Sequence, residues 1–250
     1  MKYKKYFFET LSSTNDKAKE LALDEEEGTV IIAEEQTKGR GRFGRSWYSS
    51  RGKDILLSII VKPNLDPRDM QKIVLIAAAA VNMALKDIGI SSQIKWPNDI
   101  IIDGKKVGGI LMEAAISGGE VTYGVLGIGI NVNQETNDIP DQLKNKSTSL
   151  RIVTNKKIDK EELMKFVLHR FGSYYMDYKD RGNIEDVIDI CRENSAIIGR
   201  EVFIIQGNNG TRKGFVIDIN MNGELLVDFP QGLEKISSGD LSIRGQDSYI

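Results

Sequence analysis

The sequence predicts an α+β fold, with strands and helices over residues 1–195 and a small antiparallel, barrel-like module over residues 196–250. Two observations carry this prediction. In the first range, apolar runs of strand length are separated by segments with helical periodicity. From Arg200 onward, short alternating strands are separated by turn signals at Asn208-Asn209-Gly210 and at Asn222-Gly223. This change of pattern places a domain boundary between the two ranges.

Composition limits the classes of function. The 250 residues are 40% apolar and 28% charged, with a net charge of −2, which is ordinary for a soluble globular protein and gives no general attraction to nucleic acid. No apolar run approaches the roughly 20 residues of a membrane helix. The single cysteine, Cys191, excludes an internal disulfide, and the single histidine, His169, gives no support to a His-based metal site. We expect a cytoplasmic protein whose chemistry rests on Lys, Arg, Asn, Asp and backbone amides.

The N-terminal segment combines a strand with a helix start. A short strand is expected over Lys4–Glu9 and a helix over Lys17–Ala22. Between them, Ser13, Thr14 and Asn15 are residue types that cap helices. Because a helix N-terminus also binds anions and polar groups, capping and ligand binding are both open for these three side chains.

The next elements form the structural frame. Strands are expected over Thr29–Gln36 and Asp54–Val61, the second so apolar that both of its faces should be buried. Asp66-Pro67 supplies the N-cap and the first helical residue of what should be the longest helix. Two further helices are expected, one after the acidic cap at Asp159–Glu162 and one over Ile184–Glu193.

The stretch Lys95-Trp96-Pro97-Asn98-Asp99 is informative because it interrupts a strand. Pro97 cannot donate a ladder hydrogen bond, so a strand should end there. Asn98 and Asp99 should then lie at a corner between two strands, where they form either a turn or part of a ligand site.

A hairpin is expected directly afterwards. Asp103-Gly104 predicts a type I′ turn, and a separate strand is expected over Ile110–Glu113. Lys105 should be solvated after the turn. Lys106 is the better functional candidate, because it approaches Gly108-Gly109, where the backbone can come close to a ligand.

A strand over Val121–Ile130 carries glycines near its end. Gly127 and Gly129 share one face of the pleat, and Asn131 and Asn133 continue on that face. Glycine weakens a strand and so marks the close approach of another group. A flat, glycine-lined floor that ends in asparagine suits a planar ligand.

The stretch Gln36–Trp47 places three glycines, one lysine and three arginines directly after a buried strand. Four interpretations compete: a dinucleotide-binding turn, a nucleic-acid-binding arm, a solvated basic loop, and a loop that closes over a nucleotide. The Ser-rich segment that follows does not open the helix that a dinucleotide turn requires. No second basic cluster extends a nucleic-acid footprint. Arginine matches phosphate oxygens and glycine permits close approach, so we favour the loop that closes over a nucleotide.

Taken together, these motifs resemble those of the biotin protein ligases. In order along the chain they are GRGRFGRSW at Gly39–Trp47, KWPND at Lys95–Asp99, KVGGIL at Lys106–Leu111 and GIGIN at Gly127–Asn131. The resemblance covers almost the whole chain, including the C-terminal module, whereas any one motif alone would be weak. It implies a mixed β-sheet backed by helices in a class II synthetase-like catalytic domain, followed by an SH3-like β-barrel.

The resemblance also implies a two-step reaction. The carboxylate of biotin attacks the α-phosphate of ATP, which gives biotinyl-5′-AMP and pyrophosphate. A lysine of a biotin carboxyl carrier protein domain then attacks the mixed anhydride and forms an amide. Because the first two reactants are both anions, cations must neutralise their repulsion, and Mg²⁺ assists with the phosphates.

Site residues follow from the same resemblance. Lys106 matches the lysine that spans the biotin carboxylate and the α-phosphate, and Arg42 matches the arginine that retains the adenylate; these two are the expected catalytic residues. Asp99 is expected to contact the metal or the incoming lysine. The expected biotin-binding residues are Ser13, Thr14, Asn15, Gln36, Arg40, Gly41, Arg42, Lys106, Gly109 and Gly127. The expected ATP-binding residues are Arg42, Arg45, Trp47, Asn98, Lys106 and Asn131, with Trp47 near adenine.

Expectations about partners complete the hypothesis. The first strand begins almost at Met1, which leaves no room for the N-terminal winged helix-turn-helix with which some members repress biotin operons. We expect a monofunctional ligase that binds neither nucleic acid nor membrane and forms a homodimer. Two other hypotheses stay open: a related enzyme that acts on lipoate or octanoate, and a nucleic-acid-binding module that uses the Gly-Arg loop, the stretch Gln36–Trp47.

Overall fold

The computed structural model describes residues 1–63, 66–206, 210–239, 241–245 and 249. It confirms an α+β chain. The helices are α1 (Thr14–Leu21), α2 (Met70–Asp87), α3 (Leu150–Thr154), α4 (Lys160–Arg181) and α5 (Glu185–Glu193). The strands are β1 (Lys4–Leu11), β2 (Thr29–Gln36), β3 (Ile55–Val61), β4 (Gln93–Lys95), β5 (Asp99–Ile102), β6 (Lys105–Ser117), β7 (Glu120–Ile130), β8 (Glu201–Gln206), β9 (Thr211–Ile219), β10 (Leu225–Phe229), β11 (Gly232–Ile236) and β12 (Leu241–Arg244).

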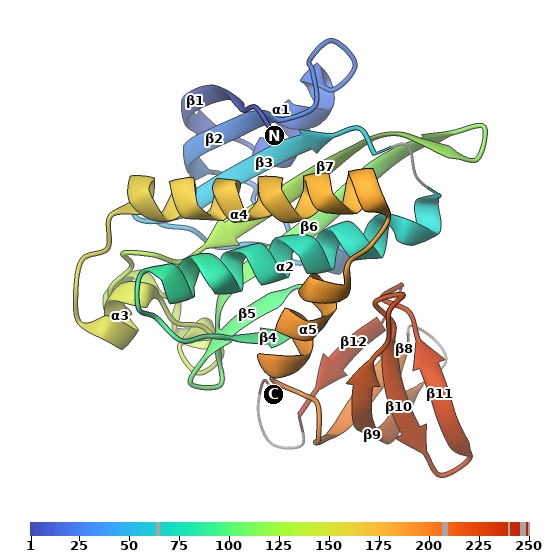
Figure 1. Ribbon diagram of the computed structural model, residues 1–250. Helices are drawn as coiled ribbons and strands as arrows, with labels where there is room; N and C mark the ends of the chain where they lie inside the picture. Colours follow the sequence, from blue (N-terminus) through green and yellow to red (C-terminus); the bar gives the residue numbers. More distant parts are fainter. Residues whose placement is uncertain (64–65, 207–209, 240, 246–248, 250) are drawn as a thin grey trace.

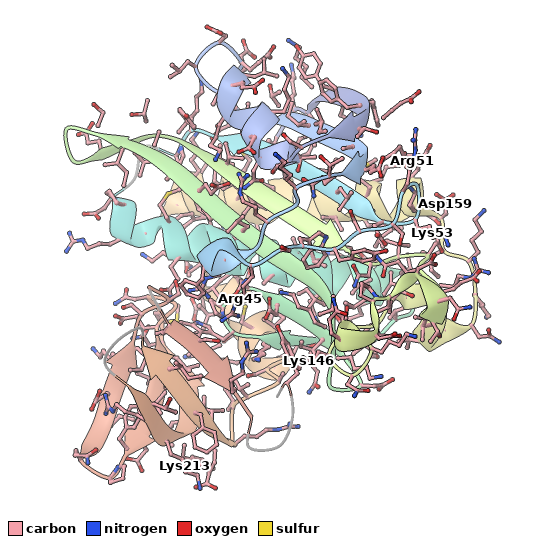
Figure 2. The ribbon with its side chains drawn as sticks, turned by 180° about the vertical axis from the view of Figure 1, so that it is seen from behind. Arg45, Arg51, Lys53, Lys146, Asp159 and Lys213 are labelled. Carbon is pink, nitrogen blue, oxygen red and sulfur yellow. The ribbon has the colours of Figure 1, made fainter. Side chains whose placement is uncertain are left out.

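The strands form two sheets. The larger sheet is mixed and has the order β1-β2-β3-β7-β6-β5-β4, in which only β1 and β2 pair in parallel. Helices α2 and α4 lie side by side across one of its faces, and α5 leads toward the smaller sheet (Figure 1). Helix α1 packs on β2, β3 and β7 from the opposite face, which Figure 2 shows from behind. None of the helices in the described ranges has the length and apolar composition needed to cross a membrane.

The smaller sheet is the predicted C-terminal module. Its five antiparallel strands have the order β11-β10-β9-β8-β12, which is compatible with an SH3-like fold. The predicted turn at Asn222-Gly223 is present, with Gly223 at a φ of 78°. Asn208 and Asn209, of the other predicted turn, lie outside the described residues.

Most of the predicted elements are confirmed, but three details were wrong. The longest helix is α4, with 22 residues against 18 for α2. The segment Pro67–Asp69 forms a 3₁₀ turn, capped by the Asp66 side chain, so that the α-helix begins only at Met70. Strand β6 runs without a break for 13 residues, because Gly108 and Gly109 both pair across to β7 and continue the ladder.

One apolar cluster continues from the larger sheet into the C-terminal module. It joins Leu75 of α2 and Cys191 of α5 to Val216 and Leu225 of the smaller sheet. The buried indole of Trp96 adds a polar link, since its Nε1 donates to the carbonyl oxygen of Gly223 at 2.9 Å. We propose that residues 1–195 and 196–250 are two modules, one for each sheet, and that the two modules share one hydrophobic core.

A shared core predicts a shared unfolding transition. Leu75 is fully buried and its Cδ1 lies against Gly223, at the contact between the two modules. Leu75→Ala should lower the free energy of unfolding by about 2–5 kcal/mol, and unfolding should stay a single transition, because the cavity lies in a core common to both modules. Leu23→Ala is the matched control: Leu23 is 72% exposed, so its loss should change stability by less than about 0.5 kcal/mol. Two separated transitions in a calorimetric scan of Leu75→Ala would contradict the shared core.

Candidate functional site

Two adjoining cavities lie on the face of the larger sheet opposite α2 and α4. The smaller has a volume of about 50 Å³ and lies between the start of α1 and strands β6 and β7. The larger has a volume of about 340 Å³ and lies between the larger sheet and the C-terminal module. Figure 2 shows Arg45 and Lys146, which line the larger cavity, in this region. The two linings share Gly41, Arg42, Trp47, Asn98 and Lys106.

The structure brings the predicted site residues together in the two groups into which the sequence had divided them. All ten residues predicted to bind biotin line the smaller cavity. All six predicted to bind ATP line the larger one, as does Asp99. Lys106 and Arg42, which were placed in both sets, belong to both linings. Asn133, which was expected on the glycine-lined face, does not join them and instead bonds the backbone of Ile158. Lys105, which was expected outside the site, lines neither cavity and bonds the carbonyl oxygen of Lys144.

Hydrogen bonds fix the polar wall of the smaller cavity. The Gln36 Oε1 atom accepts from the backbone N–H of Thr14 at 2.7 Å and from its hydroxyl at 3.1 Å. The buried Ser58 hydroxyl lies 2.6 Å from Asn15 Oδ1 and donates to it. Ser13 is the N-cap of α1, yet its side chain makes no capping hydrogen bond. The Ser13 hydroxyl is therefore not used to stabilise the helix.

Arg40 closes the smaller cavity through an ion pair with α1. Its guanidinium donates to both carboxylate oxygens of Asp16, at 2.7 and 2.5 Å. These hydrogen bonds hold the pKa of Asp16 at about 2, so the carboxylate is ionised near neutral pH. Glu113 adds a second anion beside them, since it accepts from Asn15 Nδ2 at 2.7 Å and from Lys19 at 2.9 Å. The loop that carries Arg40 is thus tied to the first helix.

The glycine floor predicted from β7 is present, but side chains of the protein itself lie on it. A Cβ atom at Gly127 would lie 2.3 Å from Asn15 Oδ1, and one at Gly129 would lie 2.7 Å from Trp47 Cε2. A Cβ atom at Gly109 would lie 3.0 Å from Lys106 Nζ. The absence of side chains at these positions therefore allows Asn15, Trp47 and Lys106 to approach the sheet.

An ion pair stands where the two cavities meet. Lys106 Nζ lies 2.5 Å from Asp99 Oδ1 and 5.4 Å from the centre of the Trp47 ring. Burial by itself would raise the pKa of Asp99, but the charge and hydrogen bond of Lys106 outweigh it and lower the pKa. The Asp99 carboxylate is therefore ionised, and Lys106 lies in the lining of both cavities.

Arg42 joins three parts of the site. One of its nitrogens donates to Asn98 Oδ1 at 3.2 Å, and Asn98 is itself held by a 3.0 Å bond from its Nδ2 to the carbonyl oxygen of Ile110. The other terminal nitrogen donates to the carbonyl oxygens of Ser238 and Gly239, in the C-terminal module. The Gly-Arg loop is therefore connected to the corner after Pro97 and to the smaller sheet.

The larger cavity has a strongly cationic lining, part of which the sequence reasoning did not identify. Among the described residues, Asp99 is its only carboxylate, against six cationic side chains: Arg42, Arg45, Lys95, Lys106, Lys146 and Arg244. Lys95 belongs to the KWPND motif but had no predicted role, and no pattern in the sequence indicated a role for Lys146. Arg244 and Tyr249 come from the C-terminal module, and the strand pattern in the sequence does not show where this module lies relative to the larger sheet. A cavity with this excess of cations suits a polyanion.

A metal site held by the protein does not fit this lining. The described part of the chain holds no group of three or more His, Cys, Asp or Glu side chains that could bind a metal ion. Asp99 offers one carboxylate, and both of its oxygens already accept from neighbouring side chains. A divalent cation prefers several oxygen ligands, so any in this cavity would be held mainly by the ligand and by water.

Lys95 gives the site a measurable dependence on pH. Burial lowers its pKa from 10.5 to about 7, since only 3% of the residue is exposed. Between these values the unfolded chain binds more protons than the folded protein does, so this lysine makes the free energy of unfolding rise with pH. The wild type should therefore gain stability relative to Lys95→Met by up to about 1.4 kcal/mol per pH unit from pH 7 to 9. Denaturant titrations at pH 7, 8 and 9 measure the difference, and a difference that stays constant would contradict the lowered pKa.

Comparisons with known proteins agree with this geometry. Residues 7–131 match the family described as the biotin/lipoate A/B protein ligase family. The bifunctional ligase/repressor BirA of Bacillus subtilis is 38% identical over 240 residues, which span 95% of this chain and 73% of that protein. The biotin–[acetyl-CoA-carboxylase] ligase of Paracoccus denitrificans is 27% identical over 237 residues, which span 93% of this chain and 98% of that protein.

Solved structures give the same result. The biotin protein ligase from Aquifex aeolicus, in complex with biotin and ATP, superimposes with a TM-score of 0.84 at 30% identity. The superposition covers 98% of this chain and 100% of that one. The resemblance inferred from the motifs is confirmed: this chain belongs to the biotin/lipoate A/B protein ligase family and, within it, to the biotin protein ligases.

Proposed function

We propose that this ligase uses ATP to activate biotin as biotinyl-5′-AMP and then transfers the biotinyl group to a lysine of a biotin carboxyl carrier protein domain. The observation that carries this proposal is the pair of cavities that meet at Lys106 and Arg42. Biotin occupies the smaller cavity and ATP the larger one. The relative from Aquifex aeolicus, whose structure contains both biotin and ATP, supports the binding of these two ligands by one chain.

Biotin can enter only after the smaller cavity widens. Its volume of about 50 Å³ is far below the ~300 Å³ at which small-molecule sites begin. We expect the Gly-Arg loop to be the part that moves, because it forms one side of the cavity with Arg40 and Gly41, whereas most of the other lining residues belong to helix α1 and the larger sheet.

Lys106 is placed to neutralise both reactants. The carboxylate oxygen of biotin attacks the α-phosphorus of ATP, a P–O bond forms, and pyrophosphate leaves with the electron pair of the broken bond. The ammonium exchanges Asp99 for the biotin carboxylate and the α-phosphate, and so stabilises the charge that gathers between them. ATP brings Mg²⁺ as part of the substrate, and the phosphate oxygens and water hold it.

The remaining residues orient and retain the intermediate. Arg42 and Arg45 face the phosphates from the loop, and Asn98 and Asn131 lie on the nucleotide side. Trp47 covers Gly129 at the boundary between the cavities, so we place the adenylate beside its indole. Thr14, Asn15 and Gln36 offer polar groups to the biotin ring.

Removal of Lys106 should stop the first half-reaction. Lys106→Ala leaves the two anions without the cation that spans them, so biotin-dependent exchange of labelled pyrophosphate into ATP should fall by roughly 10²–10³-fold. Lys105→Ala is the matched control, because Lys105 lines neither cavity and its side chain bonds the carbonyl oxygen of Lys144. Exchange by Lys106→Ala at the wild-type rate would remove Lys106 from this role.

Removal of Arg42 should separate formation of the adenylate from its retention. Arg42→Gly should keep the fold and release biotinyl-5′-AMP, so that lysines of unrelated proteins become biotinylated. Streptavidin blots of a protein mixture measure this loss of specificity. Arg51→Gly is the control on the same connecting segment, since Arg51 pairs with Glu9 at the surface and lines neither cavity. An Arg42→Gly variant that is inactive and still specific would contradict retention by Arg42.

The proposed function is tested by pyrophosphate exchange with Mg²⁺ in the presence of biotin, lipoate or octanoate. Exchange with biotin alone is the expected outcome. Preference for lipoate or octanoate would favour the related acyl-transfer enzyme.

The nucleic-acid hypothesis predicts salt-dependent binding of oligonucleotides. If no such binding is measured, that hypothesis is removed. The cytoplasmic location and the homodimer stay predictions, for which fractionation and sedimentation are the measurements.

A further inference from the structure

We propose that Tyr249 is a positioning residue for adenylation: its hydroxyl fixes Asp99, which in turn holds Lys106 at the junction of the two cavities. The inference rests on the function proposed above. It adds to the site a residue from the end of the chain that none of the sequence motifs includes.

The Asp99 carboxylate is held at both oxygens. Oδ1 lies 2.5 Å from Lys106 Nζ, and Oδ2 accepts a hydrogen bond from the Tyr249 hydroxyl at 2.5 Å. The third contact, from Asn98 Nδ2 to Oδ1, is longer at 3.3 Å. The direction in which Asp99 presents its oxygen to Lys106 therefore depends on Tyr249.

Tyr249 is anchored by contacts of its own. Its carbonyl oxygen accepts from Lys95 Nζ at 2.5 Å, and the same ammonium lies 3.8 Å from the centre of its ring. The guanidinium of Arg244 lies 5.4 Å from that ring. Lys95 is buried, and a buried amino group needs such partners in either protonation state. Burial also raises the pKa of Tyr249, so the phenol stays protonated and its hydroxyl donates a hydrogen bond to Asp99.

The hydrogen bond from Tyr249 to Asp99 matters when Lys106 turns toward the substrates. Asp99 then loses its closest cation and would be left as a half-buried carboxylate with one long hydrogen bond. A carboxylate that is shielded from water and lacks a donor is unfavourable. The Tyr249 hydroxyl keeps one oxygen satisfied, so Asp99 stays in place and Lys106 changes partners without a rearrangement of the corner after Pro97.

A different role would have the opposite consequence. Tyr249 lines the larger cavity, so it could instead obstruct ATP. An obstructing tyrosine must leave before ATP binds, so loss of its hydrogen bond to Asp99 would lower the KM for ATP or raise the rate. A positioning tyrosine stays in place, so loss of the same hydrogen bond lowers the rate of the chemical step.

Tyr249→Phe separates these roles, since it keeps the ring beside Lys95 and Arg244 and removes only the hydroxyl. We expect the kcat of biotin-dependent pyrophosphate exchange to fall by roughly ten- to a hundredfold, the effect of one hydrogen bond to a charged group. The KM values for ATP and biotin, and the transfer of biotin from preformed biotinyl-5′-AMP, should not change. Tyr123→Phe is the matched control, because Tyr123 lies on β7 outside both cavities. An unchanged kcat, or a lower KM for ATP, would overturn the proposal.

A second readout does not depend on the enzymatic activity. The rate at which an amine-reactive reagent labels Lys106, measured by mass spectrometry, reports how firmly Asp99 holds it. Labelling of Lys106 should be several times faster in Tyr249→Phe than in the wild type or Tyr123→Phe, with Lys105 as the internal reference. Equal labelling in all three proteins would overturn the positioning role. A wild type without biotin-dependent exchange would instead refute the proposed function, and the labelling would still decide the role of Tyr249.

Discussion

The ion pair between Lys106 and Asp99 is the interaction on which the site depends. A lysine that must lie between two anionic reactants has to be held in position before the substrates bind, and the half-buried Asp99 carboxylate does this at 2.5 Å. The pair requires its own surroundings: a corner between β4 and β5 that presents Asp99, and glycines on β6 and β7 that leave room for the lysine. The larger sheet can be understood as the frame that brings these short stretches together.

The C-terminal module takes part in the same site. Its backbone accepts from Arg42 at Ser238 and Gly239, its Arg244 lines the larger cavity, and Tyr249 bonds Asp99. The core runs without interruption from α2 into the smaller sheet. The module therefore does more than extend the fold, because it supplies one wall of the cationic cavity and connects that wall to the Gly-Arg loop.

Much of this could be predicted from the sequence, for physical reasons. The boundaries of β2 were predicted to the residue, because its apolar run is flanked by turn residues and ends at the glycines. The two groups of site residues came from the resemblance to the biotin protein ligases that the motifs carry, and not from strand patterns alone. The hairpin at Asp103-Gly104 followed from its turn chemistry, and both residues have positive φ.

The parts that could not be predicted are those that depend on contacts distant in sequence. Asp99 and Tyr249 are 150 residues apart, and no local pattern relates them. The glycines of β7 indicated a close approach, but the sequence could not say that Asn15 and Trp47 are the groups that make it. Likewise, Gly108 and Gly109 were expected to separate two strands, whereas pairing with β7 keeps them inside one long strand.

The central claim is that two anions meet at Lys106, one from each cavity. A crystal structure of the protein with biotinyl-5′-AMP tests it most directly. The account predicts the biotin ring beside Asn15 and Gly127, the nucleotide in the cationic cavity, and the acyl phosphate within hydrogen-bond distance of Lys106 Nζ. An adenylate that lies in the opposite direction, or whose phosphate is held away from a Lys106 still paired with Asp99, would contradict it.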